Sequence, residues 1–150
     1  MQYTDMFSLE THDGDETSIS YRIAGNGPPL LLLHGFPQTN MMWHKIAPAL
    51  AERYTVVAAD LRGYGDSGHP ASDAAHAPYS KRAMAADMAG LMRGLGHDSF
   101  MVAGHDRGGR VAHRLARDHG DCVTRIAVLD IAPTAAMYGQ TDMRLSLIHI

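Results

Sequence analysis

The stretch Gly104-His105-Asp106-Arg107-Gly108-Gly109 decides how this chain of 150 residues folds. It follows an apolar run, Ser99 to Ala103, and opens a segment with helical spacing, Arg107 to His119. An abrupt passage from strand to helix strains the backbone of the central residue, and glycines two positions away on either side let neighbouring backbone come close. The pattern therefore predicts a sharp turn that lifts the Asp106 carboxylate above the edge of a sheet.

An aspartate in such a turn indicates a particular chemistry. Free amides and the positive end of the helix dipole favour negative charge at the start of a helix. A carboxylate that displaces a group from a saturated carbon leaves an ester that water can cleave, whereas a serine would leave a stable ether. The turn thus favours dehalogenation or epoxide opening by Asp106 over ordinary ester hydrolysis. In the alternative interpretation, Asp106 only caps a helix within a glycine-rich turn.

Apolar runs alternate with helical segments along the rest of the chain. A turn-rich segment, 12–16, lies between two stretches that predict a hairpin, and four further runs predict buried strands. The hairpin strands are Phe7 to Thr11 and Ser18 to Ala24, and the buried strands are Pro29 to Leu33, Tyr54 to Ala59, Ser99 to Ala103 and Val123 to Ile131. Helices are expected from a cap at Asn40 through Leu50, from Ser80 to Gly94 or Gly96, and from Arg107 to His119.

This alternation predicts the α/β class, with a mostly parallel sheet, helices on both of its faces and an antiparallel hairpin at one edge. Reactive groups should then gather at the carboxyl ends of the strands. The turn His34-Gly35-Phe36-Pro37 follows one strand, and an amide there, that of Phe36, is expected to form an oxyanion hole with the amide of Arg107. A plain strand-ending turn is the alternative. His34 and His105 are expected to support the site through hydrogen bonds.

Two arginines lie in the first turn of the helix that follows Asp106. Cations are disfavoured at this end of a helix, so Arg107 and Arg110 suggest an anion between or above them. Three residues apart, the two guanidinium groups can converge on one substrate carboxylate. Alternatively, Arg110 belongs to a solvated stripe with His113, Arg114 and Arg117.

Polar residues also follow the other strands. Asp130 ends the strand after the turn at Asp106 and could orient a histidine, or it could cap a turn. Asp60 is expected to anchor a loop without a catalytic role. The segments Arg62 to Gly68 and Pro70 to Pro78 are rich in turn residues and are expected to be surface connections.

The composition narrows the class of protein. A formal net charge of −3 and a pI near 6.3 give no reason to expect a nucleic acid or an anionic membrane as partner. The acidic amino terminus has no signal-peptide pattern, and Cys122 is a single cysteine, so a cytoplasmic location is expected. The histidines are not spaced like metal ligands, and neither a metal nor a cofactor is expected.

Together, several motifs resemble the haloacetate dehalogenases of the α/β-hydrolase superfamily, which include the fluoroacetate dehalogenases. The motifs are His34-Gly35-Phe36-Pro37-Gln38, Trp43, Arg62-Gly63-Tyr64-Gly65-Asp66-Ser67, the stretch from Gly104 to Arg110, and Val128-Leu129-Asp130-Ile131. The resemblance implies that Asp106 is the nucleophile, that Arg107 and Arg110 hold the carboxylate of a small haloacid, and that Asp130 is the acid of a triad. Gly35 and Trp43 would support this site alongside His34 and His105.

The same resemblance implies parts that this sequence does not contain. The family has a general-base histidine after its last strand, and a helical cap that binds the halide. We therefore expect residues 1–140 to be the N-terminal part of the core, with about six of eight strands, and the chain alone to turn over poorly. Residues 141–150 are expected to be a tail whose last six residues, Leu145 to Ile150, resemble a translated library adapter. The full-length protein could be a homodimer that acts on a haloacid and water.

Two other functions stay open at this point. One is an epoxide hydrolase, which would use the same nucleophile but would have tyrosines in its cap to protonate the opening ring. The other is a hydrolase-like fragment without catalysis that binds a partner or a small anion, since a sheet without its last strands leaves an open apolar edge.

Overall fold

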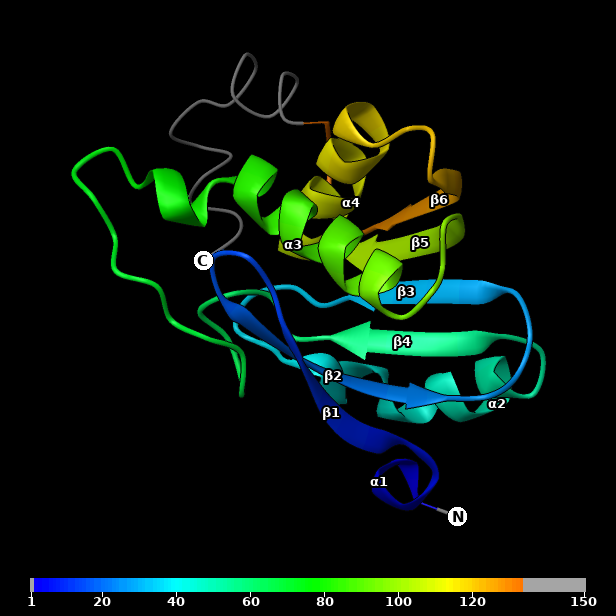
Figure 1. Ribbon diagram of the computed structural model, residues 1–150. Helices are drawn as coiled ribbons and strands as arrows, with labels where there is room; N and C mark the ends of the chain where they lie inside the picture. The colour runs from blue at the N-terminus through cyan, green and yellow to red at the C-terminus, as the bar shows by residue number, and fades with distance from the viewer. Residues whose placement is uncertain (1, 134–150) are drawn as a thin grey trace, which may run out of the picture.

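The computed structural model describes residues 2–133, which form one six-stranded sheet with helices on both faces (Figure 1). The strands run in the order β1-β2-β4-β3-β5-β6. They are β1 (Ser8–Asp13), β2 (Ser18–Ala24), β3 (Pro29–Leu33), β4 (Thr55–Ala59), β5 (Phe100–His105) and β6 (Val123–Leu129). Strands β1 and β2 form the predicted antiparallel hairpin at one edge, and β3 to β6 are parallel to one another. The predicted α/β architecture is confirmed.

The central strands are buried on both faces because their side chains alternate. Leu31 and Leu33 on β3 pack in one cluster with the helices α3 (Lys81–Gly94) and α4 (Arg107–Asp118). Leu32 points to the opposite face, where it packs in a second cluster with α1 (Tyr3–Met6) and α2 (Ala47–Ala51). In Figure 1, α3 and α4 accordingly lie together on one side of the sheet and α2 lies on the other.

The helix α3 follows its predicted pattern closely. The side chains of Met84, Met88, Leu91 and Met92 are buried, and the hydroxyl of Ser80 accepts a hydrogen bond from the amide of Ala83 at 3.2 Å. An apolar stripe at helical spacing and a serine cap were therefore sufficient to locate this helix.

The segment after β3 differs from its prediction. A continuous helix capped by Asn40 was expected, but the chain forms a 3-10 helix, η1 (Asn40–Lys45), which Thr39 caps, and only then the short α2. Asn40 is buried, and its amide donates to Oδ1 of Asp60 at 2.6 Å. The Asp60 carboxylate therefore accepts a hydrogen bond from an amide at the start of η1 that has no partner within the helix.

The segment after β4 is expected to lie at the surface, and for Arg62 and Ser67 this is wrong. Arg62 is only 1% exposed, because its guanidinium is held by Asp87 (2.6 Å), Glu16 (3.0 Å) and the carbonyl of Pro78 (2.7 Å). Ser67 is also buried, whereas residues 71–77 are exposed as predicted. A second short 3-10 helix, η2 (Ala77–Tyr79), leads into α3.

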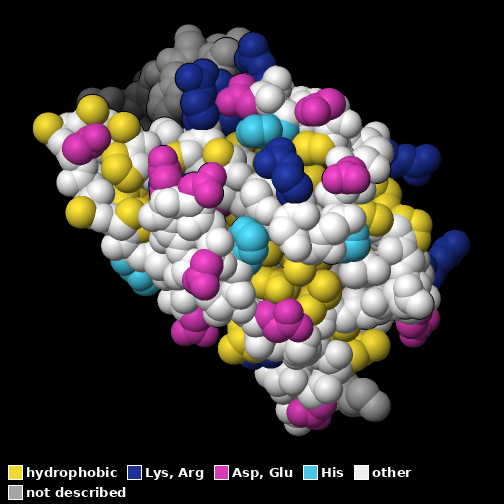
Figure 2. Space-filling view, viewed as in Figure 1, with side chains coloured by type: hydrophobic (Ala, Val, Ile, Leu, Met, Phe, Trp, Pro, Cys, Tyr) yellow, Lys and Arg dark blue, Asp and Glu magenta, His cyan; other side chains and the backbone are white. Residues whose placement is uncertain are grey.

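None of the helices within residues 2–133 is long and apolar enough to cross a bilayer. On the face shown in Figure 2, acidic side chains are interspersed with lysines, arginines and histidines. The carboxyl ends of β4, β5 and β6 point to the same edge of the sheet in Figure 1, and the candidate site lies at this edge.

Candidate active site

Asp106 lies in the tight turn between β5 and α4, in the place that the sequence predicts. Its φ of 48° is in the region that side chains other than glycine rarely adopt. Its own amide donates to the carbonyl of Leu129 at 3.1 Å, at the end of the neighbouring strand β6. The carboxylate oxygen Oδ2 accepts a hydrogen bond of 3.0 Å from the backbone amide of Phe36. The turn thus presents the carboxylate to the end of β3.

Three glycines make this close approach possible. A Cβ atom on Gly35 would lie 2.7 Å from Cβ of Asp106 and 2.9 Å from its Oδ2. A Cβ on Gly104 would meet the backbone of Gly108, and a Cβ on Gly108 would meet the backbone at the end of β3. The glycines around the turn are therefore required by the space that is left for them.

His34 holds the turn that carries the Phe36 amide. The imidazole is fully buried, and its Nε2 accepts a hydrogen bond of 3.0 Å from the amide of Leu61. Nδ1 must therefore carry the proton, and it donates to the carbonyl of Gly35 at 2.8 Å. Burial lowers the pKa of His34, although the Gly35 carbonyl and Asp60 act in the opposite direction. A neutral histidine thus joins the end of β4 to the turn beside Asp106.

Arg107 is the first residue of α4, and its guanidinium lies against an aromatic wall. The group lies 4.9 Å from the centre of the Phe36 ring, and Nη1 donates to the hydroxyl of Tyr64 at 3.4 Å. The Tyr64 ring also meets His34 edge-on, with ring centres 5.1 Å apart. Tyr64 is not among the site residues predicted from the sequence, although its position five residues after the end of β4, at the edge where the strands end, was a usable signal.

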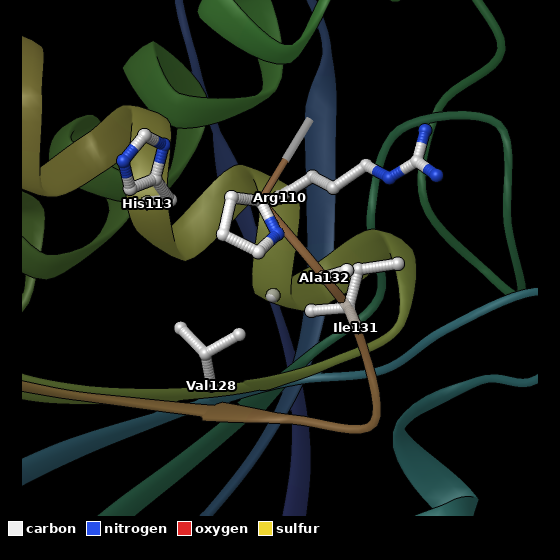
Figure 3. A pocket seen from close by; sticks show the side chains of 7 residues that line it. Arg110, His113, Val128, Ile131 and Ala132 are labelled. Atoms are coloured by element: carbon white, nitrogen blue, oxygen red, sulfur yellow. The ribbon is translucent and has the colours of Figure 1, made fainter. Parts of the chain in front are cut away.

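Arg110 is the fourth residue of α4 and is half-buried, whereas His113 and Arg117 of the same helix are exposed. It lines a cavity of about 270 Å³ together with Gly109, His113, Val128 and residues 131–133. Figure 3 shows that the guanidinium extends away from His113 and from the aliphatic side chains of Val128 and Ile131. Arg110 is thus less exposed than His113 and Arg117, two residues that the alternative interpretation groups with it, whereas the third, Arg114, is also half-buried.

Asp130 follows β6 with a φ of 51°, and its side chain is 91% exposed. Its Oδ2 lies 3.7 Å from Nε2 of His105, the residue before Asp106. The structure thus brings Asp130 next to one of the two histidines expected to support the site. His105 Nδ1 faces Gly35 and has no hydrogen-bond partner among the described residues.

Trp43 and Asp60 are buried beneath the turns that form the candidate site. Trp43 is buried in the apolar cluster with Tyr3, Phe7 and Leu32, so its contribution is to the packing behind η1. Asp60 is buried and anchors two loops, because besides Asn40 it accepts a hydrogen bond from the amide of Asp66 at 3.3 Å. The anchoring expected of Asp60 is confirmed by these contacts.

The arrangement places a carboxylate beside a backbone donor, at the start of a helix that carries two arginines. Asp106 faces the Phe36 amide, and Arg107 and Arg110 begin the helix that leaves the turn. Among residues 2–133, no three histidine, cysteine, aspartate or glutamate side chains are grouped to hold a metal ion. A carboxylate in this position can attack an electrophilic carbon, and the amide beside it can stabilise a developing oxyanion.

A comparison with known protein families is decisive for the fold. Residues 28–148 match the profile of the α/β-hydrolase fold family. The chain belongs to the α/β-hydrolase family. This α/β hydrolase is 55% identical over 136 residues to a fluoroacetate dehalogenase of Burkholderia sp, an alignment that covers 91% of the chain and 45% of that protein. It is 48% identical over 113 residues to a soluble epoxide hydrolase of Corynebacterium sp. (strain C12), covering 75% and 38% of the two chains.

Solved structures agree with this assignment of the fold. A crystal structure of a Nostoc sp PCC 7120 protein assigned to the α/β hydrolases superposes with a TM-score of 0.95 at 55% identity, covering 98% of this chain and 50% of that one. An epoxide hydrolase from an endophytic Streptomyces superposes with a TM-score of 0.81 at 32% identity, covering 85% and 38%. The chain thus spans half or less of the length of these relatives. Residues 134–150, which include the predicted tail, lie outside the described residues.

Proposed function

We propose that the protein to which this chain belongs hydrolyses a short 2-haloacid, such as a haloacetate, to the 2-hydroxyacid. The observation that carries the proposal is the Asp106 carboxylate held 3.0 Å from the Phe36 amide at the start of a helix with Arg107 and Arg110. The identity of 55% to a fluoroacetate dehalogenase supports the choice of substrate class.

In the first step, a carboxylate oxygen of Asp106 attacks the carbon that bears the halogen, from the side opposite to the halogen. A carbon–oxygen bond forms, and the carbon–halogen bond breaks with its electron pair leaving as halide. Arg107 and Arg110 hold the carboxylate of the substrate, since guanidinium forks match carboxylate geometry. The product of this step is an ester between Asp106 and the substrate.

In the second step, water adds to the carbonyl carbon of the Asp106 ester. The negative charge that develops on the carbonyl oxygen is stabilised by the amides of Phe36 and Arg107. Collapse of this intermediate releases the 2-hydroxyacid and leaves one oxygen from water in the Asp106 carboxylate. A histidine oriented by Asp130 would take the proton from water, as the resemblance to the family implies.

The test uses the 150-residue chain with chloroacetate. We expect Asp106 to gain the mass of a carboxymethyl group with the release of one chloride per chain, and the adduct to accumulate because hydrolysis is slow. The variant Asp106→Asn, which lacks the attacking carboxylate, should gain no mass at position 106. Chloride release with alkylation at other residues only, or equal labelling of the variant, would contradict the proposal.

A second candidate function is the hydrolysis of epoxides, which the identity of 48% to a soluble epoxide hydrolase favours. The same carboxylate would attack an epoxide carbon, and the ring oxygen would leave as an alkoxide that must be protonated. An epoxide has no carboxylate for the two arginines to bind. Binding of a haloacid should therefore require Arg110, whereas binding of an epoxide should not, and this difference distinguishes the two functions.

A further inference from the structure

Tyr64 contacts three residues of the candidate site at once. Its hydroxyl accepts the hydrogen bond of 3.4 Å from Nη1 of Arg107. Its ring meets the ring of Phe36 edge-on, with centres 6.5 Å apart, and meets the ring of His34 in the same way at 5.1 Å. His34 holds the turn that carries the Phe36 amide, and this amide donates to Asp106. Tyr64 therefore connects the first residue of α4 to the turn at the end of β3.

The loop that carries Tyr64 is held on both sides of this residue. Two residues before it, the guanidinium of Arg62 is buried in its ion pair with Asp87. Three residues after it, the buried hydroxyl of Ser67 donates to the carbonyl of Asp60 at 2.7 Å, and the Ser67 amide donates to the carbonyl of Tyr64 at 3.1 Å. Because both flanking residues are buried and hydrogen-bonded, the backbone that carries the Tyr64 ring has little freedom to move.

Arg107, in contrast, has an exposed and intrinsically flexible side chain. A long side chain that moves freely loses conformational entropy when it binds a ligand, and this loss weakens binding. In the structure, Cζ of Arg107 lies over the ring of Phe36 at 4.9 Å from its centre, and the hydroxyl of Tyr64 binds Nη1.

These two contacts are compatible with the binding of a carboxylate by the same arginine. A guanidinium group has five N–H donors, and a hydrogen bond to one hydroxyl uses a single donor. A fork of two hydrogen bonds to a carboxylate can therefore form while the Tyr64 contact is kept. The aromatic residues Phe36 and Tyr64 thus orient the guanidinium of Arg107 before an anion binds.

We propose that Tyr64 is a positioning residue for Arg107 and thereby increases the preference of the site for small carboxylates over neutral ligands of the same size. The inference rests on the proposed function in assigning Arg107 to the substrate carboxylate. Tyr64 does not touch the substrate in this account. It acts through Arg107, whose guanidinium it holds beside the turn that presents Asp106.

The test is a titration of the 150-residue chain with acetate, which has no leaving group, followed by nuclear magnetic resonance. We expect Tyr64→Phe to weaken acetate binding about fivefold, a factor typical of one net hydrogen bond, because the ring stays and only the bond to Arg107 is lost. The matched control is Tyr79→Phe, which removes a hydroxyl that donates to the carbonyl of Pro70 at 2.7 Å. This control should leave acetate binding unchanged, and neutral acetamide should bind all of these chains equally.

A double-variant cycle shows whether Tyr64 acts through Arg107. In the variant Arg107→Met, Arg110 is still present to bind acetate. The further change Tyr64→Phe should then leave acetate binding unchanged, because the hydrogen bond that it removes is already absent. A purely structural role of Tyr64 would weaken acetate binding in both backgrounds and would weaken acetamide binding as well.

Equal affinity of Tyr64→Phe and the unaltered chain for acetate would overturn the inference. An equal loss in Tyr79→Phe, additive losses in the double variant, or no binding of acetate at all would overturn it too. Labelling of Asp106 by chloroacetate is measured separately. Labelling without an effect of Tyr64 on acetate binding would refute only this inference, whereas acetate binding that depends on Tyr64 without labelling would refute only the proposed function.

Discussion

The backbone amide of Phe36 and the carboxylate of Asp106 are joined by a hydrogen bond of 3.0 Å although 70 residues separate them in the chain. The contact follows from the sheet, because β3 and β5 are parallel neighbours in which Leu33 lies opposite Gly104. The turns that follow β3 and β5 therefore lie next to each other at the same edge of the sheet. The pairing of β3 with β5 therefore positions the two turns that carry the Phe36 amide and Asp106.

Gly35→Ala should disturb this contact directly. The added methyl group would lie 2.7 Å from Cβ of Asp106, so the carboxylate or the turn must move. We expect the rate at which chloroacetate labels Asp106 to fall on the order of a hundredfold, as misplacement of reacting groups by about 1 Å can cause. Gly90→Ala is the matched control, because nothing lies within 4 Å of its added Cβ. A Gly35→Ala chain that is labelled at the normal rate would rule out close packing as the reason for glycine.

Arg110→Ala should separate the two candidate functions. If the substrate carries a carboxylate, loss of a charge-assisted hydrogen bond of about 1.5–3 kcal/mol should weaken acetate binding roughly tenfold to a hundredfold. Labelling by a neutral epoxide should change little. His113→Ala provides the control, since this exposed residue lies on the same helix and lines the same cavity. Unchanged acetate binding in Arg110→Ala would favour the epoxide hydrolase.

His34 should make the stability of the chain depend on pH. Its pKa in the folded chain lies below the value of about 6.5 in the unfolded chain. The unfolded chain therefore binds the proton first as the pH falls below about 6.5, and the free energy of unfolding should decrease until the folded pKa is passed. Urea unfolding at several pH values would measure this decrease.

His34→Gln should remove that part of the pH dependence, because glutamine does not titrate. Burial raises the pKa of Asp87, which acts with the opposite sign, but this contribution is common to both chains and cancels in the difference. Parallel curves for the two chains would show that His34 is not the titrating group.

Arg62→Met should destabilise the fold strongly. Asp87 would remain buried without its partner, and removing one member of a buried ion pair costs about 3–5 kcal/mol. Urea unfolding of Arg114→Met is the control, because its partner Asp118 lies at the surface, where an ion pair contributes about 0–1 kcal/mol. The double variant Arg62→Met with Asp87→Leu should recover part of the loss. A similar loss in both single variants would argue against the importance of burial.

The sequence predicts the architecture well because the signals are local and strong. Continuous apolar runs identify β3 and β4, and the glycines around Asp106 identify the turn, since a Cβ atom at these positions would meet neighbouring backbone or the Asp106 side chain. The sequence also predicts correctly that the turns after β3, β5 and β6 lie at one edge of the sheet, because the carboxyl ends of parallel strands are on the same side.

The missed features depend on contacts between distant segments. Arg62 is a surface residue by composition, and only the carboxylates of Asp87 and Glu16, from two other elements, make its burial possible. The burial of Asn40 at the start of η1 depends on Asp60, which lies twenty residues away and binds its amide. Tyr64 becomes a candidate only when the loop after β4 is placed beside the start of α4.

The unusual backbone conformation at Asp106 has a consequence for how new activities arise on this scaffold. The bend is imposed by β5, by α4 and by the glycines around it, so it does not depend on the aspartate side chain. A serine placed at position 106 would arrive beneath the same amide of Phe36 with a hydroxyl in place of a carboxylate. One codon change would thus place a group suited to acyl transfer at position 106, while the frame around this position stays the same.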